Sequence, residues 1–368
     1  DSLNSLGAMY ENGYGVKKDY AKAKELYEKA ANLGIRQAKT NLAFLRNKME
    51  SEKKGLVQSA TQQKAEPQPK EQPVTKVEPQ PVQKIASKQE SNPKVDLTPN
   101  VEPQPKEETI LVDTDIPVIS RVNKNTFAVI IANEDYMDEA KVDFAKNDGE
   151  VFKNYCHKTL GMPEKNIHYL PNATLAKMFG ELDWLRQVCE AYGGEANVIF
   201  YYSGHGFPDE QSHSAYLLPI DGSSRLLRTC FSVSELYEML GSMPSKRVTV
   251  LMDACFSGAK RNGDMLASAR GVAIKAKMGA PKGSMIVLSA AKGDETAYKY
   301  EDAKHGLFTY FLLKKLKDSK GNVTLGELTR YIQDQVGRYS IVENGKSQTP
   351  TVQASDNLKG RWESMMFE

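Results

Sequence analysis

The sequence predicts an α/β domain built on a mostly parallel sheet, preceded by a linker and a small all-α segment. From about residue 125 onward, short apolar runs alternate with amphipathic stretches, as strands alternate with helices in such domains. Several of these runs are apolar at almost every position, which is typical of strands that are buried on both faces of a parallel sheet. The residues before 123 lack this alternation, so we expect the α/β domain to occupy residues 123–368.

Residues 1–45 predict two helices joined by a Gly-Tyr-Gly turn. Apolar side chains repeat at helical spacing around Leu6 and Tyr10, and again from Tyr20 to Ala31. The run Leu-Gly-x-x-Tyr-x-x-Gly-x-Gly-Val-x-x-Asp-Tyr-x-x-Ala-x-x-x-Tyr-x-x-Ala-Ala resembles the Sel1-like repeat family. That resemblance implies a scaffold that binds other proteins. Because one such unit cannot bury its own faces, we expect it to be the last unit of a longer solenoid.

Residues 46–122 predict a disordered linker. This stretch has no aromatic residue, repeats Glu-Pro-Gln-Pro three times and consists largely of Lys, Gln and Glu. Such a composition buries too little apolar area to offset the entropy lost on ordering the chain. Its prolines favour an extended, semi-rigid spacer. A Pro-rich ligand for a recognition domain is the alternative, and we favour the linker.

The α/β domain is predicted to contain six strands separated by helices. The strands are expected at residues 127–132, 166–170, 198–203, 247–252, 284–289 and 349–353. The helices are expected near residues 143–159, 175–191, 232–240, 307–317 and 325–336. In open sheets of this kind, active sites form beyond the carboxyl ends of the central strands.

Overall composition limits the classes of partner. The 368 residues include 49 basic and 47 acidic side chains, a balance that does not indicate nucleic-acid binding. No apolar run approaches the roughly 18 residues of a membrane span, so we expect a soluble protein. We also expect a monomer. The chain begins at Asp1 without a leader, which suggests a fragment. Its compartment stays open, with the cytoplasm favoured.

Four cysteines are spread along the α/β domain, at Cys156, Cys189, Cys230 and Cys255. None forms a Cys-x-x-Cys pair, so neither a zinc site nor a dithiol redox motif is indicated. A domain of this size does not need disulfides to be stable. We therefore expect four reduced thiols, mostly buried.

Two neighbouring strands are predicted to end in reactive side chains. One continues into Ser203-Gly-His205-Gly206, and the other into Asp253-Ala-Cys255-Phe-Ser-Gly. A thiol is a nucleophile only as the thiolate, and a nearby imidazole can accept its proton and later protonate the leaving amine. The glycines allow close backbone approach, so that main-chain N–H groups can stabilise an oxyanion.

These two strand ends, about 50 residues apart, resemble the caspase, metacaspase and orthocaspase group. Further matches extend over most of residues 123–356, including Ile131-Ala-Asn-Glu-Asp-Tyr136, Lys146-Asn-Asp148, Leu217-Leu-Pro-Ile-Asp221, His305-Gly-Leu-Phe-Thr309 and Gln348-Thr-Pro350. The resemblance implies a three-layer caspase-like fold and a cysteine peptidase. It assigns Cys255 as nucleophile, His205 as general acid/base, and the N–H groups of Gly206 and Cys255 as the oxyanion hole. We interpret His213 and His305 as structural.

Asp253 indicates which peptide bond is cut. It lies two residues before Cys255, so on a strand both side chains point to the same face, and its carboxylate would attract a basic substrate side chain. Metacaspases and orthocaspases share this Asp-x-Cys pattern and cleave after Arg or Lys. By the same resemblance, Asp148 and Ser203 line the pocket, with Asp135 as a further acidic neighbour. The strand end at Ser289 and Ala290 is expected to pair with the substrate backbone.

Two further expectations concern activation. A basic segment between two core strands, which should form a surface loop, predicts self-cleavage after one or more of Lys260, Arg261, Arg270, Lys275 and Lys277. Many metacaspases require calcium, held partly by an Asp-Asp pair after the Leu-Pro-x-Asp segment. Here Asp221 is present and no such pair follows. We therefore predict no cofactor and no metal, with calcium as the alternative.

Two other functions stay open. One is a catalytically silent adaptor, in which the helical repeat binds partners and the peptidase fold serves as a binding module. The other is a clostripain-like or legumain-like cysteine hydrolase. The intact Cys255, His205, Asp253 and Gly206 argue against the first, and the Asp-Ala-Cys-Phe-Ser-Gly context argues against the second.

Overall fold

The computed structural model of the protein describes residues 17–33, 110–257 and 275–368, together with helical positions among residues 3–11 and 38–45. These residues fall into two units, Asp1–Glu108 and Thr109–Glu368.

The first unit contains helix α2 (Tyr20–Asn32), which confirms the second predicted helix. Asp19 caps its start by accepting hydrogen bonds from two backbone N–H groups of the first turn. The buried face carries Ala23 and Tyr27. A Cβ atom at Gly7 would lie 2.7 Å from the Tyr27 ring, so the small residue lets the two helical segments pack closely.

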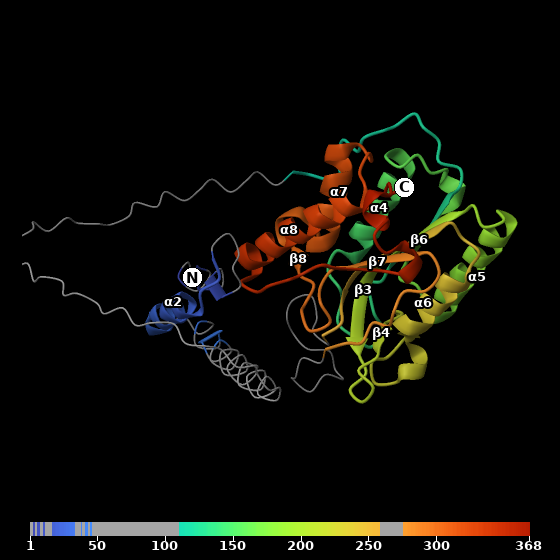
Figure 1. Ribbon diagram of the computed structural model, residues 1–368. Helices are drawn as coiled ribbons and strands as arrows, with labels where there is room; N and C mark the ends of the chain where they lie inside the picture. Colours follow the sequence, from blue (N-terminus) through green and yellow to red (C-terminus); the bar gives the residue numbers. More distant parts are fainter. Residues whose placement is uncertain are drawn as a thin grey trace, which may run out of the picture. The chain divides into compact units, whose positions relative to one another are not determined.

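The second unit is built on a mostly parallel sheet, as the sequence predicts (Figure 1). Within the described residues its main path has the strand order β10-β7-β6-β3-β1-β2. Neighbours pair in parallel except at β10, which pairs antiparallel to β7 at one edge. The bounds are β1 Thr126–Ala132, β2 Ile167–Pro171, β3 Asn197–Pro208, β6 Arg247–Cys255, β7 Met285–Ser289 and β10 Thr351–Ala354.

Helices cover both faces of this sheet and produce two apolar cores. One face packs against α4 (Ala145–Lys158), α7 (Leu307–Ser319) and α8 (Leu325–Asn344). The other packs against α5 (Leu175–Ala191) and α6 (Val233–Ser242). Figure 1 shows the sheet between these two groups, which confirms the three-layer arrangement. Every residue of β1 and β7 is buried, as their almost uniformly apolar sequences predict.

Several short elements were not predicted. They are β4 Ala215–Leu217, β5 Phe231–Ser232, β8 Lys299–Tyr300, β9 His305–Gly306, η1 Glu164–Asn166, η2 Leu227–Thr229, η3 Glu301–Ala303, η4 Asp356–Leu358 and η5 Trp362–Ser364. Two or three residues are too few to show a strand or helix period, so they leave no signal in the sequence. The longest difference among the helices is at α8, which continues to Asn344 and ends at a left-handed Gly345.

All four cysteines are buried and none forms a disulfide. Burial raises the pKa of Cys156, Cys189 and Cys230, so these thiols stay protonated near neutral pH. Among the residues that the structure covers, no helix combines the length and the apolar character needed to cross a bilayer.

Candidate functional site

The two predicted reactive side chains end adjacent strands in register. In the parallel pair β3 and β6, His205 lies opposite Cys255 and Ser203 lies opposite Asp253. Neighbouring strands are about 4.8 Å apart, and residues two apart on a strand share a face. The four side chains therefore gather on one face of the sheet, the face that α4 and α7 cover. Both His205 and Cys255 are almost completely buried.

The imidazole of His205 is held by the loop between β1 and α4. Its Nε2 lies 2.7 Å from the carbonyl oxygen of Ala140, and because a carbonyl only accepts, Nε2 must carry a proton. In the neutral imidazole, Nδ1 is then the atom that can accept a proton. The Tyr136 ring lies against the imidazole, with 4.7 Å between centroids, and its hydroxyl accepts the backbone N–H of His205 at 2.7 Å. Loop and strand thus fix both the orientation and the tautomer of His205.

The sulfur of Cys255 lies against the peptide of Ala297. The Ala297 N–H donates to Sγ at 3.0 Å, and Sγ lies 3.2 Å from the Ala297 carbonyl oxygen. A backbone N–H aimed at the sulfur stabilises negative charge there. The segment that carries Ala297 is in turn held by Gln348, whose side chain accepts from the Tyr298 N–H at 2.8 Å.

Gly206 is required by its surroundings. A Cβ atom at this position would lie 2.7 Å from the ring of Phe256 and 3.0 Å from the carbonyl oxygen of Cys255. No real Cβ makes so short a contact with a packed ring and with backbone at once. Any larger residue would therefore displace the two strand ends from each other.

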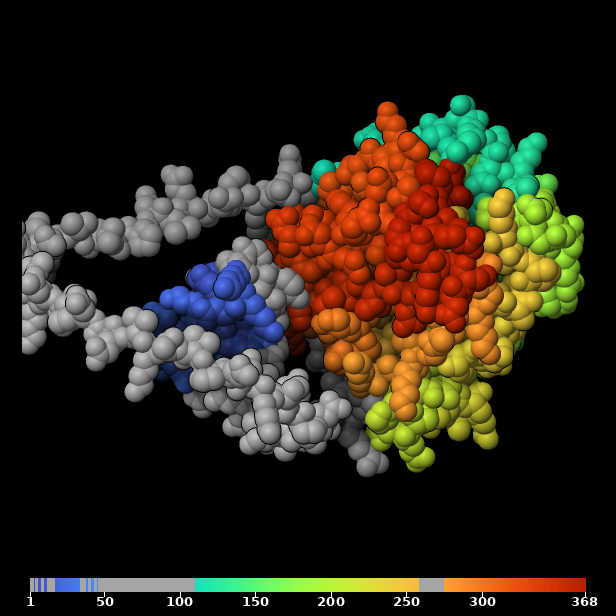
Figure 2. Space-filling view, viewed as in Figure 1, coloured from blue at the N-terminus to red at the C-terminus, as the bar shows by residue number. Residues whose placement is uncertain are grey.

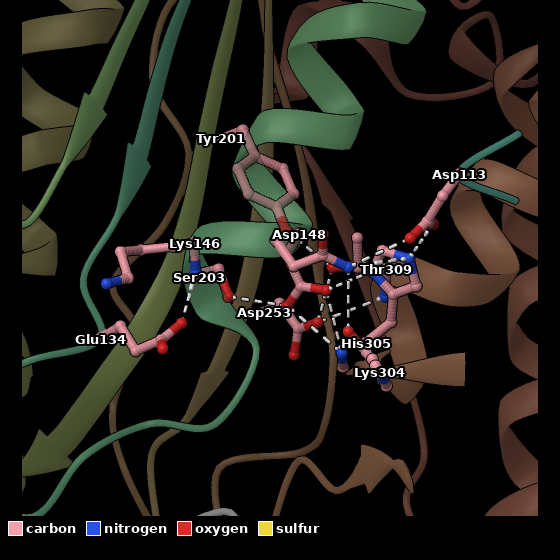
Figure 3. Close-up of polar contacts among 12 residues, drawn as sticks. Asp113, Glu134, Lys146, Asp148, Tyr201, Ser203, Asp253, Lys304, His305 and Thr309 are labelled. Carbon is pink, nitrogen blue, oxygen red and sulfur yellow. Dashed lines mark hydrogen bonds and ion pairs between the residues drawn. The ribbon is translucent and has the colours of Figure 1, made fainter. Parts of the chain in front are cut away.

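Asp253 is fully buried and faces the start of α7 (Figure 3). Its Oδ2 accepts from the Thr309 hydroxyl at 2.6 Å and from the Thr309 N–H at 3.2 Å. The Thr309 hydroxyl also lies 2.7 Å from the hydroxyl of Tyr201, which precedes Ser203 by two residues on β3. Both of these Thr309 donors are neutral groups.

Asp148 is also fully buried, and it has a cationic partner within the protein. It accepts hydrogen bonds from the Ser203 hydroxyl at 3.1 Å and from the Gly306 N–H at 3.0 Å. Its Oδ1 lies 2.8 Å from Nδ1 of His305, whose Nε2 lies 2.6 Å from Asp113 (Figure 3). Burial lowers the pKa of His305, but the two carboxylates outweigh burial and raise it to about 9. His305 is therefore an imidazolium at neutral pH.

The other predicted binding residues lie apart from this cluster. Asp135 is exposed and binds Lys146 at 2.7 Å. Ser289 and Ala290 are buried, and the Ala290 peptide is occupied within the domain. Its N–H donates to Met252 and its carbonyl accepts from Gln348. The structure therefore does not present the Ala290 peptide as a free edge for a substrate backbone.

The predicted self-cleavage sites lie only partly within the described residues. Lys260, Arg261 and Arg270 lie outside them. Lys275 is exposed, whereas Lys277 is tied by its backbone, donating from its N–H to His213 at 2.7 Å and accepting from Ala215 at 3.2 Å. A peptide bond held in such a bridge is a poorer substrate than one in an open loop.

The described residues contain no group of three or more His, Cys, Asp or Glu side chains arranged to hold a metal ion. Asp221, which the sequence analysis weighed as a calcium ligand, accepts the N–H of Leu175 at the start of α5, at 3.0 Å. That contact is a helix cap, since it satisfies one of the free N–H groups of the first turn.

The sequence analysis did not name four residues as part of the site. Tyr136 and Thr309 belong to motifs that it quoted, and their polar tips could have marked them as partners of the strand ends. Asp113 had no such signal, because it lies in a stretch with the composition of the linker. Ala297 contributes only backbone atoms, which leave no trace in residue type.

Two family models match this chain. A model of the caspase domain matches residues 125–360, and a model of the Sel1 repeat matches residues 1–35. A search of curated proteins finds no match. Among solved structures, protein GSU0716 from Geobacter sulfurreducens is 19% identical, with a TM-score of 0.48 over 63% of this chain and 93% of that chain. Caspase-1 from Spodoptera frugiperda is 14% identical, with a TM-score of 0.46 over 67% and 94% of the two chains.

The caspase-domain match begins just before β1 and ends beyond β10, so it covers the whole central sheet and both strand ends at its centre. The match to the Sel1 repeat covers α2. The chain therefore belongs to the caspase family of cysteine peptidases and carries a Sel1 repeat ahead of its peptidase domain.

Proposed function

We propose that this protein is an endopeptidase that cleaves after Arg or Lys, with Cys255 as nucleophile and His205 as general acid/base. The observation that carries the proposal is the register of β3 and β6, which sets His205 opposite Cys255 and Ser203 opposite Asp253. One strand pair thus supplies both a nucleophile–base pair and, one step along the same face, an acidic group. This is the pattern of metacaspases and orthocaspases.

The chemistry follows from these positions. The His205 imidazole takes the thiol proton on Nδ1 while Nε2–H stays bound to the Ala140 carbonyl. The sulfur attacks the scissile carbonyl carbon, and the N–H groups of Gly206 and Cys255 receive the oxyanion. His205 then gives its proton to the leaving amine as the C–N bond breaks. Water, deprotonated by His205, hydrolyses the resulting thioester and restores the thiol.

The preference for a basic residue rests on charge. Asp253 lies two residues, or about 7 Å, from Cys255 along β6. A long Arg or Lys side chain attached next to the scissile bond spans that distance, and an Asp side chain does not. Asp148 lies on the same face and is bound to Ser203. With Asp113 and the imidazolium of His305 included, the cluster has a surplus of negative charge, which favours a cationic guest.

The same specificity supports self-cleavage in the basic segment before β7. Of the two described candidates, the exposed Lys275 is the more accessible, and Lys260, Arg261 and Arg270 are further candidates. Wild-type protein is expected to be cut there during incubation, and Cys255→Ala protein to stay intact. The Sel1 repeat would supply a second, separate means of selecting protein partners.

The decisive experiment is turnover of short fluorogenic peptides with Arg, Lys, Asp or Asn before the scissile bond. We expect cleavage of the Arg and Lys peptides by the wild type and none by Cys255→Ala. A Cys189→Ala variant is the matched control, because it removes a buried thiol on the other face of the sheet. Cleavage after Asp alone would contradict the basic pocket, and no cleavage of any peptide would favour a catalytically silent adaptor.

A further inference from the structure

A short strap, residues 110–118, runs over the surface beside α4 and α7 before β1 begins. It belongs to the stretch that composition assigns to the linker, yet it packs on the peptidase domain. Tyr155 donates to the carbonyl of Val112 at 2.8 Å, and Lys317 donates to the carbonyls of Leu111 and Thr114 at 2.8 and 2.7 Å. Val112 itself is 1% exposed. In Figure 2 the teal atoms of this region lie at the surface of the domain, next to those of α7.

The strap carries one carboxylate toward the acidic cluster. Asp113 Oδ1 lies 2.6 Å from Nε2 of His305, and His305 Nδ1 lies 2.8 Å from Asp148 on its other side. Figure 3 shows the imidazole between the two carboxylates. The His305 side chain is completely buried, whereas that of Asp113 is 40% exposed. A buried imidazole with a carboxylate on each nitrogen donates from both, which requires the charged form.

We propose that Asp113 is a positioning residue for the specificity pocket: by binding the far side of His305, it holds the imidazolium against Asp148 and so fixes the place of that carboxylate and the net charge of the three groups. This inference rests on the proposed function, since it treats Asp148 as a pocket residue. It adds that the pocket is completed by a segment outside the central sheet, at the end of the linker.

The charge count shows what Asp113 contributes. With Asp113 present, two carboxylates flank one imidazolium, and the three groups together carry one negative charge. Without it, Asp148 and a charged His305 cancel, and a negative charge returns only when His305 loses its proton. The raised pKa of His305, about 9, keeps the wild-type cluster in one state through neutral pH. Removing Asp113 moves that titration toward neutral pH, because one of the two favourable carboxylates is gone.

Other charged and polar groups near His305 do not replace Asp113. From α4, the Asn147 side chain lies 3.4 Å from Nε2 of His305 and donates to the carbonyl of Lys304. Lys304, next in the chain, is a cation that favours the charged form of Asp113. When Asp113 is neutralised, the described contacts therefore leave His305 with a single carboxylate partner, Asp148.

The test compares the full-length wild type with Asp113→Asn and with Asp115→Asn, an exposed residue of the same strap. Peptides with Arg and with its neutral analogue citrulline before the scissile bond are assayed from pH 6.5 to 9. For the wild type and Asp115→Asn we expect the ratio of kcat/KM for the Arg peptide to kcat/KM for the citrulline peptide to stay constant from pH 6.5 to 8. For Asp113→Asn we expect the ratio to fall about fivefold at pH 6.5 and to recover as His305 deprotonates. The rate of Cys255 alkylation by iodoacetamide should be equal in all three.

A second measurement separates this inference from the proposed function. NMR titration of the five histidines, with His305→Gln for assignment, should show His305 charged through pH 8 in the wild type and titrating lower in Asp113→Asn. An unshifted His305, or an Arg-to-citrulline ratio that does not respond to Asp113→Asn, would overturn the inference. Equal cleavage of Arg and citrulline peptides by the wild type would instead refute the proposed function, and the titration would still decide whether Asp113 holds the imidazolium.

Discussion

Replacing Asp253 by Asn is the sharpest perturbation of the proposed specificity. The two side chains have the same shape, and Asn can keep its oxygen toward the Thr309 hydroxyl and N–H, which now bind Oδ2. The change therefore removes the carboxylate that we propose binds the basic side chain, at a fully buried position on β6, and keeps the contacts with Thr309.

The expected magnitude comes from the loss of a buried charge pair with the substrate. Truncating one partner of such a pair costs about 2 to 4 kcal/mol. At about 1.4 kcal/mol for each factor of ten, kcat/KM for an Arg peptide should fall about 30-fold to 1000-fold. The citrulline peptide carries no charge, so its kcat/KM should change by less than about threefold.

The assay is steady-state hydrolysis of matched Arg and citrulline peptides by the wild type, Asp253→Asn and Asp183→Asn. Asp183 is an exposed acid on α5, on the other face of the sheet, and controls for overall charge. Equal losses for both peptides would show that Asp253 acts by holding the strand end and not by binding the substrate. An unchanged preference for Arg would place the cation-binding group elsewhere.

Three further predictions concern the framework of the domain. Tyr136→Phe removes the hydroxyl that accepts the His205 N–H at 2.7 Å, and should lower kcat about tenfold with little change in KM, measured with the Arg peptide. Because the pKa of His305 rises to about 9 on folding, its stabilising effect is complete below about pH 6.5 and is lost as the pH rises through 9. Urea unfolding should show a loss of about 3 kcal/mol over that interval, and His305→Gln should abolish this component. Arg247→Met removes the buried guanidinium that donates to the carbonyls of Met366 and Phe367, at 2.6 and 2.8 Å, and should lower Tm by about 2 to 10 °C in calorimetry. An unchanged Tm would mean that water replaces those two bonds.

The strands show why much of the fold could be predicted. A strand that is buried on both faces must be apolar at nearly every position, and β1 and β7 are. The predicted end of β3, at residue 203, fell short, because Gly204 and His205 are small or polar and ended the apolar run. In the structure these residues continue the strand and pair with β6, and that continuation brings His205 opposite Cys255.

The pocket acids show the limit of pattern and resemblance. Asp148 and Asp253 could be named because each lies in a recognisable motif. Two buried carboxylates on one face are costly unless a cation balances their charge. For Asp148 the structure supplies a cation of its own, His305, which the sequence analysis interpreted only as a structural residue. The second carboxylate on His305 comes from Asp113, 192 positions away in the chain.

The amino-acid sequence by itself determined the order of strands and helices, the mostly parallel sheet and the presence of a cysteine–histidine pair on neighbouring strands, because periodicity and local motifs carry that information. Only the tertiary structure decided which groups surround the pair. The Ala140 carbonyl, the Tyr136 hydroxyl and the Ala297 peptide reach it from loops, and Asp113 reaches the acidic cluster from the strap. Contacts between distant segments depend on how the chain packs, and hydrogen bonds from backbone atoms do not depend on residue type. That is the physical reason why the pair was visible in the sequence and its surroundings were not.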